Sequence, residues 1–536
     1  QDPDVSNPVL ETEKTIVSMS GYQEAFSASA GHWSEIWNEI DVRVAGDREA
    51  QKLLRLHLYH MMVTASPHHA TFDAGIPPRG LHGEAYRGHI FWDELYILPL
   101  YNIHFPEVAR STLMYRYRRL DKAREYAREY GYKGAMFPWQ SGSDGREETQ
   151  VVHLNPLSGD WGDDYSSLQR HVSLAIAFNT WNYYRINQDQ EFMDDYGAEL
   201  FLSICRFWDS KSVFDESTGR YHIHKVMGPD EFHEKLPGSE EGGLTDNAYT
   251  NIMVSWMLSR AFDILDHLPE SRKKQVLEKL ELSGEDLERW DAIRHKLNLH
   301  ITDEGIVEQF RGYFDLKELD WDAYREKYDD IHRMDRVLKA EGKSPDAYKV
   351  SKQADFLMTF YNLGNEEVTR MIHELGYQVP DDYIQKNFDY YIARTSHGST
   401  LSRLVHARLA YEAGMHEKGW ELYLEALRSD LVDIQGGTTG EGIHCGVMAG
   451  TVFDALVAFG GLDLKGDIPG VSPHLPGMWK QMSFSFTFRG VRYHADLWPD
   501  EIDILSESSE KDEIKVHICG EEHTMVPGKK LVVTRN

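Results

Sequence analysis

The feature that most constrains the fold of this chain is a helical apolar period that returns along most of its length. In residues 47–64 the large apolar side chains recur at spacings that return to one face of a helix: Leu53, Leu54, Leu56, Leu58, Met61 and Met62. Similar patterns occupy residues 169–186, 194–209, 248–267, 403–428 and 446–460. A mainly α-helical fold follows, and helices at such regular intervals suit a barrel of helical hairpins.

The two ends of the chain differ from this helical body. After about residue 470, SFSFTFRGVRYHADLW and EIDILS alternate apolar with polar residues, and IKVHICG and KKLVVTR follow across turn-like breaks. We therefore predict a small antiparallel β domain over residues 469–536. Residues 1–42 are predicted to be a linker with one amphipathic helix, which leaves residues 43–468 as the helical domain.

The charge balance and the cysteines exclude several classes of protein. The chain has 536 residues, with 57 Lys and Arg against 87 Asp and Glu, so its net charge is −30. Such a surface repels nucleic acid, and an anionic substrate needs a local cluster of donors. No run reaches the roughly 18 uncharged apolar residues that a membrane helix needs. The three cysteines show no CxxC or Cys/His spacing, so neither a disulfide framework nor a metal site is expected. With a start that lacks the signal-peptide pattern, these features predict a cytoplasmic protein.

The loop KVMGPDEFHE, residues 225–234, places three carboxylates around a Gly-Pro turn, just ahead of TDNAYTN: Asp230, Glu231 and Glu234. Apolar neighbours can raise the pKa of one acid while solvent keeps the others ionised. Cleavage of a glycosidic bond requires such a protonated acid beside the leaving oxygen. Taken alone, however, this loop is better explained as a turn with solvated acids and a helix cap.

Two further loops combine aromatic with polar residues: RGLHGEAYRGHIFWDE (79–94) and FPWQSGSDG (137–145). Aromatic faces beside carboxylates and amides suit a sugar ring. For Phe91 and Trp92 alone, burial in the core is the simpler interpretation.

Glycine-rich and hydroxyl-rich segments follow later in the chain. The segment ARTSHGSTLS (393–402) can offer backbone and hydroxyl donors to an anion, although it equally resembles a helix cap. The segment QGGTTGEGIH (435–444) places Glu441 in a loop that could also be a plain tight turn.

Taken together and in this order, these segments resemble glycoside hydrolase family 65. That family contains inverting phosphorylases of maltose, trehalose, kojibiose and nigerose, and a smaller set of hydrolases. The resemblance spans about residues 70–450 and rests on RGLHGEAYRGHIFWDE, FPWQSGSDGREET, MGPDEFHE, DNAYTN, KQAD, TSHGSTLS and QGGTTGEGIH. It implies an (α/α)6 barrel with its site at one mouth, a small C-terminal β domain and a homodimer. In this family an N-terminal β-sandwich precedes the linker helix, and the sequence begins after the place where it would stand.

The resemblance also implies residue roles and a reaction. Glu231 is the implied general acid, and phosphate replaces a second protein carboxylate as the attacking group, giving β-glucose 1-phosphate and a free sugar from an α-glucosidic disaccharide. No metal or organic cofactor is implied, and inorganic phosphate is the co-substrate. The implied ligands of glucose are Trp92, Asp93, Lys352 and Gln353, and those of phosphate are Ser396, His397, Gly398 and Ser399.

Two other functions stay open. An inverting hydrolase of the same family would need a general base about 6.5–9.5 Å from the acid, for which Glu441 is the candidate. The intact TSHGSTLS segment favours phosphorolysis over it. A non-catalytic glucan-binding protein is disfavoured because Glu231 stands in an intact MGPDEFHE. Trehalose, kojibiose, nigerose, maltose and glucosyl-polyols all remain possible substrates.

Overall fold

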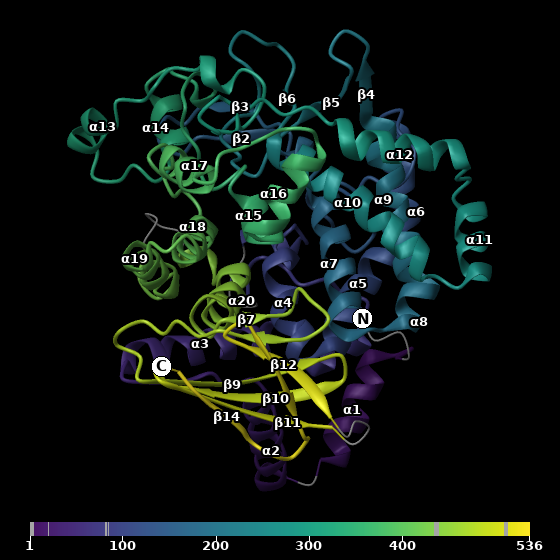
Figure 1. Ribbon diagram of the computed structural model, residues 1–536, viewed down its shortest axis with the longest axis vertical. Coiled ribbons are helices and arrows are strands. Elements are labelled where there is room, and N and C mark those ends of the chain that lie inside the picture. The colour runs from purple at the N-terminus through teal and green to yellow at the C-terminus, as the bar shows by residue number, and fades with distance from the viewer. Residues whose placement is uncertain are drawn as a thin grey trace.

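The protein consists of a helical body with a β domain beneath it. The computed structural model describes residues 5–19, 21–80, 83, 85–433, 439–508 and 513–535. In Figure 1 the strands of the β domain, drawn in yellow, lie below the barrel helices, and the longest loops cover the opposite end.

Six of the described helices form a closed inner ring in which each contacts the next and the last contacts the first. They are α4 (Glu94–His104), α7 (Val172–Asn187), α10 (Ala248–His267), α15 (Met358–Leu363), α18 (Thr400–Glu412) and α20 (Cys445–Asp454). Their side chains are buried on nearly all sides, as expected for helices that are surrounded by others. The predicted (α/α)6 barrel is thereby confirmed.

An outer layer of helices packs on this ring, one beside each inner helix. It contains α3 (Arg48–Thr64), α5 (Pro106–Arg118), α9 (Ala198–Lys211), α12 (Gly284–Lys296), α16 (Asn365–Glu374) and α19 (His416–Leu427). The predicted helix over residues 403–428 is in fact two helices, α18 and α19. The chain turns between them at Gly414, whose φ of 80° is easily adopted only by glycine. Further helices are α6 (Leu120–Glu129), α8 (Gln190–Phe192), α11 (Glu270–Lys279), α13 (Trp321–Lys327), α14 (Met334–Ala340) and α17 (Tyr383–Ile392).

Because inner and outer helices alternate along the chain, the inner helices all begin at the same end of the barrel. The segments that precede them therefore converge there, and these segments carry the motifs of the sequence. The same end bears short strands, visible at the top of Figure 1: β2 (Val152–Leu154), β3 (Trp161–Asp163), β4 (Ser212–Asp215), β5 (Arg220–Val226) and β6 (Leu244–Thr245).

The β domain contains two sheets. The larger has the order β1-β9-β10-β11-β14 and is antiparallel throughout: β1 (Arg43–Ala45), β9 (Gln481–Phe488), β10 (Val491–Leu497), β11 (Glu501–Glu507) and β14 (Leu531–Thr534). The smaller has the order β13-β12-β8-β7: β13 (Glu521–Met525), β12 (Ile514–Ile518), β8 (Gly470–Val471) and β7 (Leu462–Asp463). Its β8–β12 pair is parallel, which the alternating pattern did not predict.

The N-terminal segment connects the two parts. Helix α1 (Pro8–Ser18) is followed by α2 (Tyr22–Ile40), the predicted amphipathic helix, which contacts β9. Strand β1 pairs with β9, so residues 43–45 belong to the sheet of the β domain. The domain limits at residues 42 and 468 stay a prediction. Among the described residues, no helix has the length and apolar character needed to span a membrane.

Candidate active site

The loop of Glu231 is fixed by a close approach of its backbone to two buried side chains. A Cβ added at Gly228 would lie 2.0 Å from Asp355 Oδ2 and 2.3 Å from Asn247 Nδ2, so only glycine fits there. Three residues later the backbone of Glu231 is left-handed, with φ of 67°. A non-glycine residue in this region costs about 1 kcal/mol or more, and such strain is concentrated at functional sites.

The carboxylate of Glu231 is held by two of the residues that the sequence assigns to the sugar. Lys352 Nζ lies 2.9 Å from its Oε2, and Gln353 Nε2 donates to its Oε1 at 3.1 Å. Burial lowers the pKa of Lys352, but the charges of Glu231 and Tyr86 and the hydrogen bond to Glu231 together raise it overall. Gln353 also donates to the carbonyl of Pro229 at 2.6 Å. The structure therefore brings Glu231, Lys352 and Gln353 together, while their assigned roles stay a prediction.

Beneath this contact lies a buried polar network. His233 Nδ1 is 2.6 Å from Asp230 Oδ2, and Gln309 donates to the same oxygen at 2.9 Å. Asn247 donates to Asp355 at 2.9 Å. Burial, helped by the charge of Asp230, raises the pKa of Asp355 to about 8. This network of hydrogen bonds holds the loop of Glu231 in place.

Two carboxylates of the loop are chemically plausible acids, and their surroundings distinguish them. Burial raises the pKa of Glu234 to about 7. However, Glu234 accepts from Lys339 at 3.2 Å, and its backbone N–H donates to Asp346. Burial raises the pKa of Tyr96 on α4, and the charge of Glu231 helps to raise it, as does the charge of Asp93. Of these two acids, Glu231 is thus the one that acts on a residue of the inner ring beside Asp93, and its role as the acid stays a prediction.

Two of the predicted glucose ligands, Trp92 and Asp93, directly precede α4 and are both buried. Asp93 Oδ1 is 2.7 Å from His444 Nε2, and Thr400 Oγ1 lies 2.7 Å from His444 Nδ1. Trp92 packs edge-on against His171 at 4.8 Å between ring centroids and is only 3% exposed. Asp93 is thus oriented by a hydrogen-bonded chain, whereas little of the Trp92 ring is free for a ligand.

The predicted phosphate ligands, residues 396–399, lie in a segment that packs directly on Lys352. A Cβ at Gly398 would lie 2.5 Å from the His332 carbonyl and 3.1 Å from Lys352 Cγ. The Ser396 hydroxyl donates to the His332 carbonyl at 2.8 Å, and the Gly398 N–H donates to the Lys352 carbonyl at 2.9 Å. The structure therefore places this segment beside the Glu231–Lys352 pair.

Two other residues of the segment make polar contacts with the first turn of helix α18. Ser399 caps the helix through its hydroxyl, which accepts from the Leu401 N–H at 3.3 Å. His397 Nδ1 lies 2.9 Å from the Ser402 hydroxyl. Burial, with nearby His406 and Arg403, lowers the pKa of His397, so its ring is neutral at neutral pH. The phosphate roles of Ser396, His397, Gly398 and Ser399 stay a prediction.

Glu441, the candidate base of a hydrolase, is engaged by an arginine. Arg79 donates to its Oε2 at 3.1 Å and to the Gly442 carbonyl at 2.7 Å. The side chain of Glu441 is 44% exposed. Residues 434–438 of this glycine-rich loop, and Leu81, His82 and Glu84 of the first loop, lie outside the described residues.

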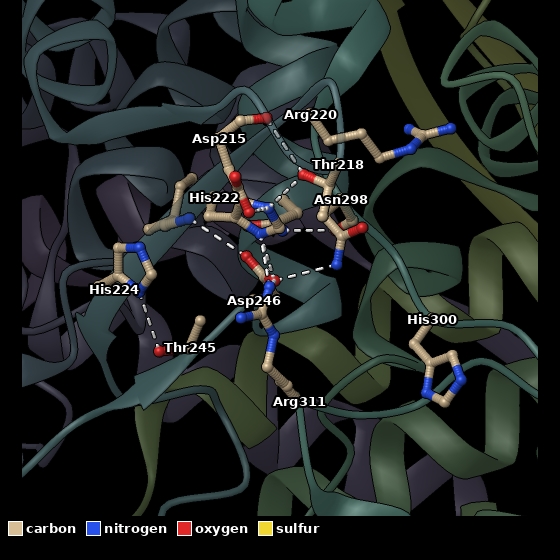
Figure 2. Close-up of polar contacts among 12 residues, drawn as sticks. Asp215, Thr218, Arg220, His222, His224, Thr245, Asp246, Asn298, His300 and Arg311 are labelled. Atoms are coloured by element: carbon tan, nitrogen blue, oxygen red, sulfur yellow. Dashed lines mark hydrogen bonds and ion pairs between the residues drawn. The ribbon is translucent and has the colours of Figure 1, made fainter.

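The DNAYTN segment contains a second polar cluster, centred on Asp246 (Figure 2). Asp246 Oδ2 lies 2.7 Å from His222 Nδ1, 2.6 Å from Arg311 and 3.0 Å from Asn298, and its Oδ1 accepts from the Ile223 N–H at 3.2 Å. This cluster anchors the strands that flank the acid loop, and Asn247, the next residue, caps α10.

The sequence did not single out the cations on and before α14. Arg333 precedes α14 and Arg336 lies in its first turns, and Tyr86 acts electrostatically on both. Glu231 also acts electrostatically on Arg333, and Glu441 acts on Arg336. The pattern HRMDR was the available signal, but charged residues on a short helix are usually solvated. No group of three or more His, Cys, Asp or Glu residues in the described part of the chain could hold a metal ion.

Comparison with known proteins identifies the two parts of the chain. Residues 55–453 match the model of the glycosyl hydrolase family 65 central catalytic domain, and residues 462–525 match the family 65 C-terminal domain. A solved structure from the human microbiome that is named for kojibiose phosphorylase superposes with a TM-score of 0.82 at 24% identity, covering 98% of this chain and 67% of that one. At this identity the match shows the fold alone.

Three curated relatives illustrate the similarity. An uncharacterized glycosyl hydrolase of Mycobacterium tuberculosis is 42% identical over 511 residues, 95% of this chain and 38% of its own. Trehalose 6-phosphate phosphorylase of Lactococcus lactis is 44% identical over 491 residues, 91% and 62% of the two chains. Kojibiose phosphorylase of Halothermothrix orenii is 30% identical over 554 aligned positions, 100% and 66%. The chain therefore spans between 38% and 66% of the length of these relatives.

Proposed function

Because the chain belongs to glycosyl hydrolase family 65, we propose that it catalyses the inverting phosphorolysis of an α-glucosidic disaccharide. The products are β-glucose 1-phosphate and a free sugar. Two of the relatives are named as phosphorylases, one of a phosphorylated and one of an unphosphorylated disaccharide. The observation that carries the proposal is the contact of Glu231 with Lys352 and Gln353 beside residues 395–399.

In this mechanism Glu231 is the only protein carboxylate that reacts. It donates its proton to the bridging oxygen as the bond from C1 to that oxygen breaks, and phosphate forms a bond to C1 from the opposite face. A phosphate bound beside Lys352 weakens the interaction between the Lys352 ammonium and Glu231. It also adds a negative charge near the Glu231 carboxylate. Both changes favour the protonated acid that the reaction needs.

The other groups hold the glucosyl unit and the loop. Asp93 accepts hydrogen bonds from sugar hydroxyls while His444 and Thr400 keep it oriented. The network of Asp230, His233 and Asp355 holds the acid loop in its strained turn. Pre-organised donors and acceptors of this kind lower the barrier because they need no rearrangement during the reaction.

The assembly and location of the protein are part of the same proposal. The family resemblance supports a homodimer, which light scattering would test. The free thiols of Cys205, Cys445 and Cys519 support a reducing, cytoplasmic location.

The proposal is tested by incubation with a panel of α-linked glucose disaccharides, with and without inorganic phosphate. Both β-glucose 1-phosphate and free glucose are measured. We expect sugar phosphate only when phosphate is present. Equal release of glucose in both conditions would instead identify a hydrolase, with Glu441 as its base.

A further inference from the structure

We propose that Arg336, together with Arg333 and Lys339, forms a second anion subsite beside the catalytic residues, which binds a phosphate group on the leaving sugar. The inference rests on the proposed function, because it assigns the acceptor half of the same substrate. It concerns an anion other than the inorganic phosphate that attacks C1.

Among the described residues the side chain of Arg336 has no direct ionic partner, although Asp335 and Glu441 act on it electrostatically. In the part of the chain that the structure describes, it makes no ion pair, and its Nε is buried without a hydrogen-bond partner. Its backbone is nevertheless fixed, because Asn155 Nδ2 donates to the Arg336 carbonyl at 3.1 Å. Buried N–H groups normally have hydrogen-bond partners, so this half-buried guanidinium on a fixed backbone has donor capacity left for an anionic ligand.

Its neighbours are also positively charged. Arg333, Lys339 and Arg336 all act on His153 of β2, and burial together with these charges lowers the pKa of that histidine. Arg333 is paired with Asp335 at 2.7 Å, and Lys339 with Glu234 at 3.2 Å. The two flanking cations thus have ion-pair partners, whereas Arg336 makes no ion pair among the described residues. In a chain of net charge −30, such a cluster is no general property of the surface.

The cluster borders the catalytic residues but differs from the predicted pocket for inorganic phosphate. Residues 395–399 pack on Lys352, and a Cβ at Gly398 would lie 3.5 Å from Arg333 Cδ. Arg333 therefore contacts that segment, and its charge also acts on Arg336. Tyr86 and Glu441, which belong to the loops that precede α4 and α20, also act electrostatically on Arg336. A ligand at Arg336 can therefore belong to the same substrate as the reacting centre.

A phosphate monoester fits this arrangement better than a carboxylate does. Its charge at neutral pH is near −2, and its three oxygens match the paired N–H donors of guanidinium groups. The acceptor class is therefore a sugar phosphate, and the preferred substrate is a phosphorylated disaccharide.

The test measures acceptor binding separately from turnover. Titration calorimetry compares glucose 6-phosphate with glucose, in the presence of saturating inorganic phosphate. The variants are Arg336→Gln and, as the matched control, Arg325→Gln on α13, whose exposed side chain pairs with Asp322. Since a charge-assisted hydrogen bond contributes about 1.5–3 kcal/mol, Arg336→Gln should weaken glucose 6-phosphate binding about 10- to 100-fold. Glucose binding, and both ligands with Arg325→Gln, should be unchanged.

Three results would overturn the subsite: no binding of glucose 6-phosphate to the unmodified protein, equal binding to Arg336→Gln, or complete displacement by inorganic phosphate. If Arg336→Gln unfolds, Arg336→Lys replaces it and should show a smaller but measurable loss. The reverse reaction, from β-glucose 1-phosphate with each acceptor, separates the two proposals. Absence of phosphate release with every acceptor contradicts the phosphorylase, whereas the calorimetric difference still decides the subsite.

Discussion

Two polar clusters lie at the same end of the barrel and contain the same kinds of residue, yet they differ in how completely they are satisfied. Around Asp246, three side chains and a backbone N–H supply all the donors that a buried carboxylate needs (Figure 2). In the cluster of Glu231, Lys352 and Arg336, the acid is partly exposed, and the side chain of Arg336 makes no ion pair among the described residues. A complete network stabilises the fold, whereas an incomplete one leaves groups for a ligand.

The largest effect is expected when Glu231, the acid of the incomplete cluster, is neutralised. Glu231→Gln should lower kcat for phosphorolysis by about 10²–10⁴-fold, since general acid catalysis contributes that much. Its thermal unfolding midpoint should stay close to that of the unmodified protein, because the side chain is partly exposed. Initial rates of β-glucose 1-phosphate formation and a thermal melt measure the two quantities.

Glu234→Gln in the same loop is the matched control for that variant. Its carboxyl has a raised pKa of about 7 but lies toward Lys339, so most activity should be retained. The opposite outcome, in which Glu234→Gln is inactive and Glu231→Gln is active, would exchange the roles of the two acids.

In the complete cluster the corresponding substitution should affect stability instead. Asp246→Asn leaves Arg311 and His222 without their buried counter-charge, which should cost about 3 kcal/mol of unfolding free energy. Urea unfolding measures this, with Asp322→Asn on exposed α13 as a control that should show no measurable change. Loss of kcat without loss of stability would show that Asp246 belongs to the reacting cluster.

The sequence predicts these two clusters unequally. Helices α3 and α10 match their predicted ranges within a residue, because an apolar period is a local property. Glu231, Lys352 and Gln353 were found through motifs of the family. Arg336 was missed because its neighbours Tyr86, Asn155 and Glu441 come from distant parts of the chain. The partners of Asp355 lie 108 and 125 residues away, so its raised pKa could not be read from KQAD alone.

Asp355 gives a smaller, pH-dependent test of the network beneath the acid. Burial raises its pKa from 3.8 to about 8, so between these values the folded protein keeps a proton that the unfolded chain releases. Its contribution to stability is fully present below pH 3.8 and is lost as the pH rises to about 8. The slope reaches at most about 1.4 kcal/mol per pH unit.

Asp355→Asn removes this titration while keeping the shape of the side chain. Unfolding free energies at several pH values between 5 and 8 should therefore fall less steeply for Asp355→Asn than for the unmodified protein. Parallel curves would show that Asp355 is ionised in the folded state.

The smallest effect is expected at Glu441, and it separates a phosphorylase from a hydrolase. If phosphate is the nucleophile, no base is needed, and Glu441→Gln removes only a partly exposed ion pair with Arg79. Such pairs contribute up to about 1 kcal/mol, so the rate of phosphorolysis should change by less than about fivefold. A general base would cost about 10²–10⁴-fold. If Glu441→Gln instead greatly reduced a release of glucose that is independent of phosphate, Glu441 would be identified as the general base of a hydrolase.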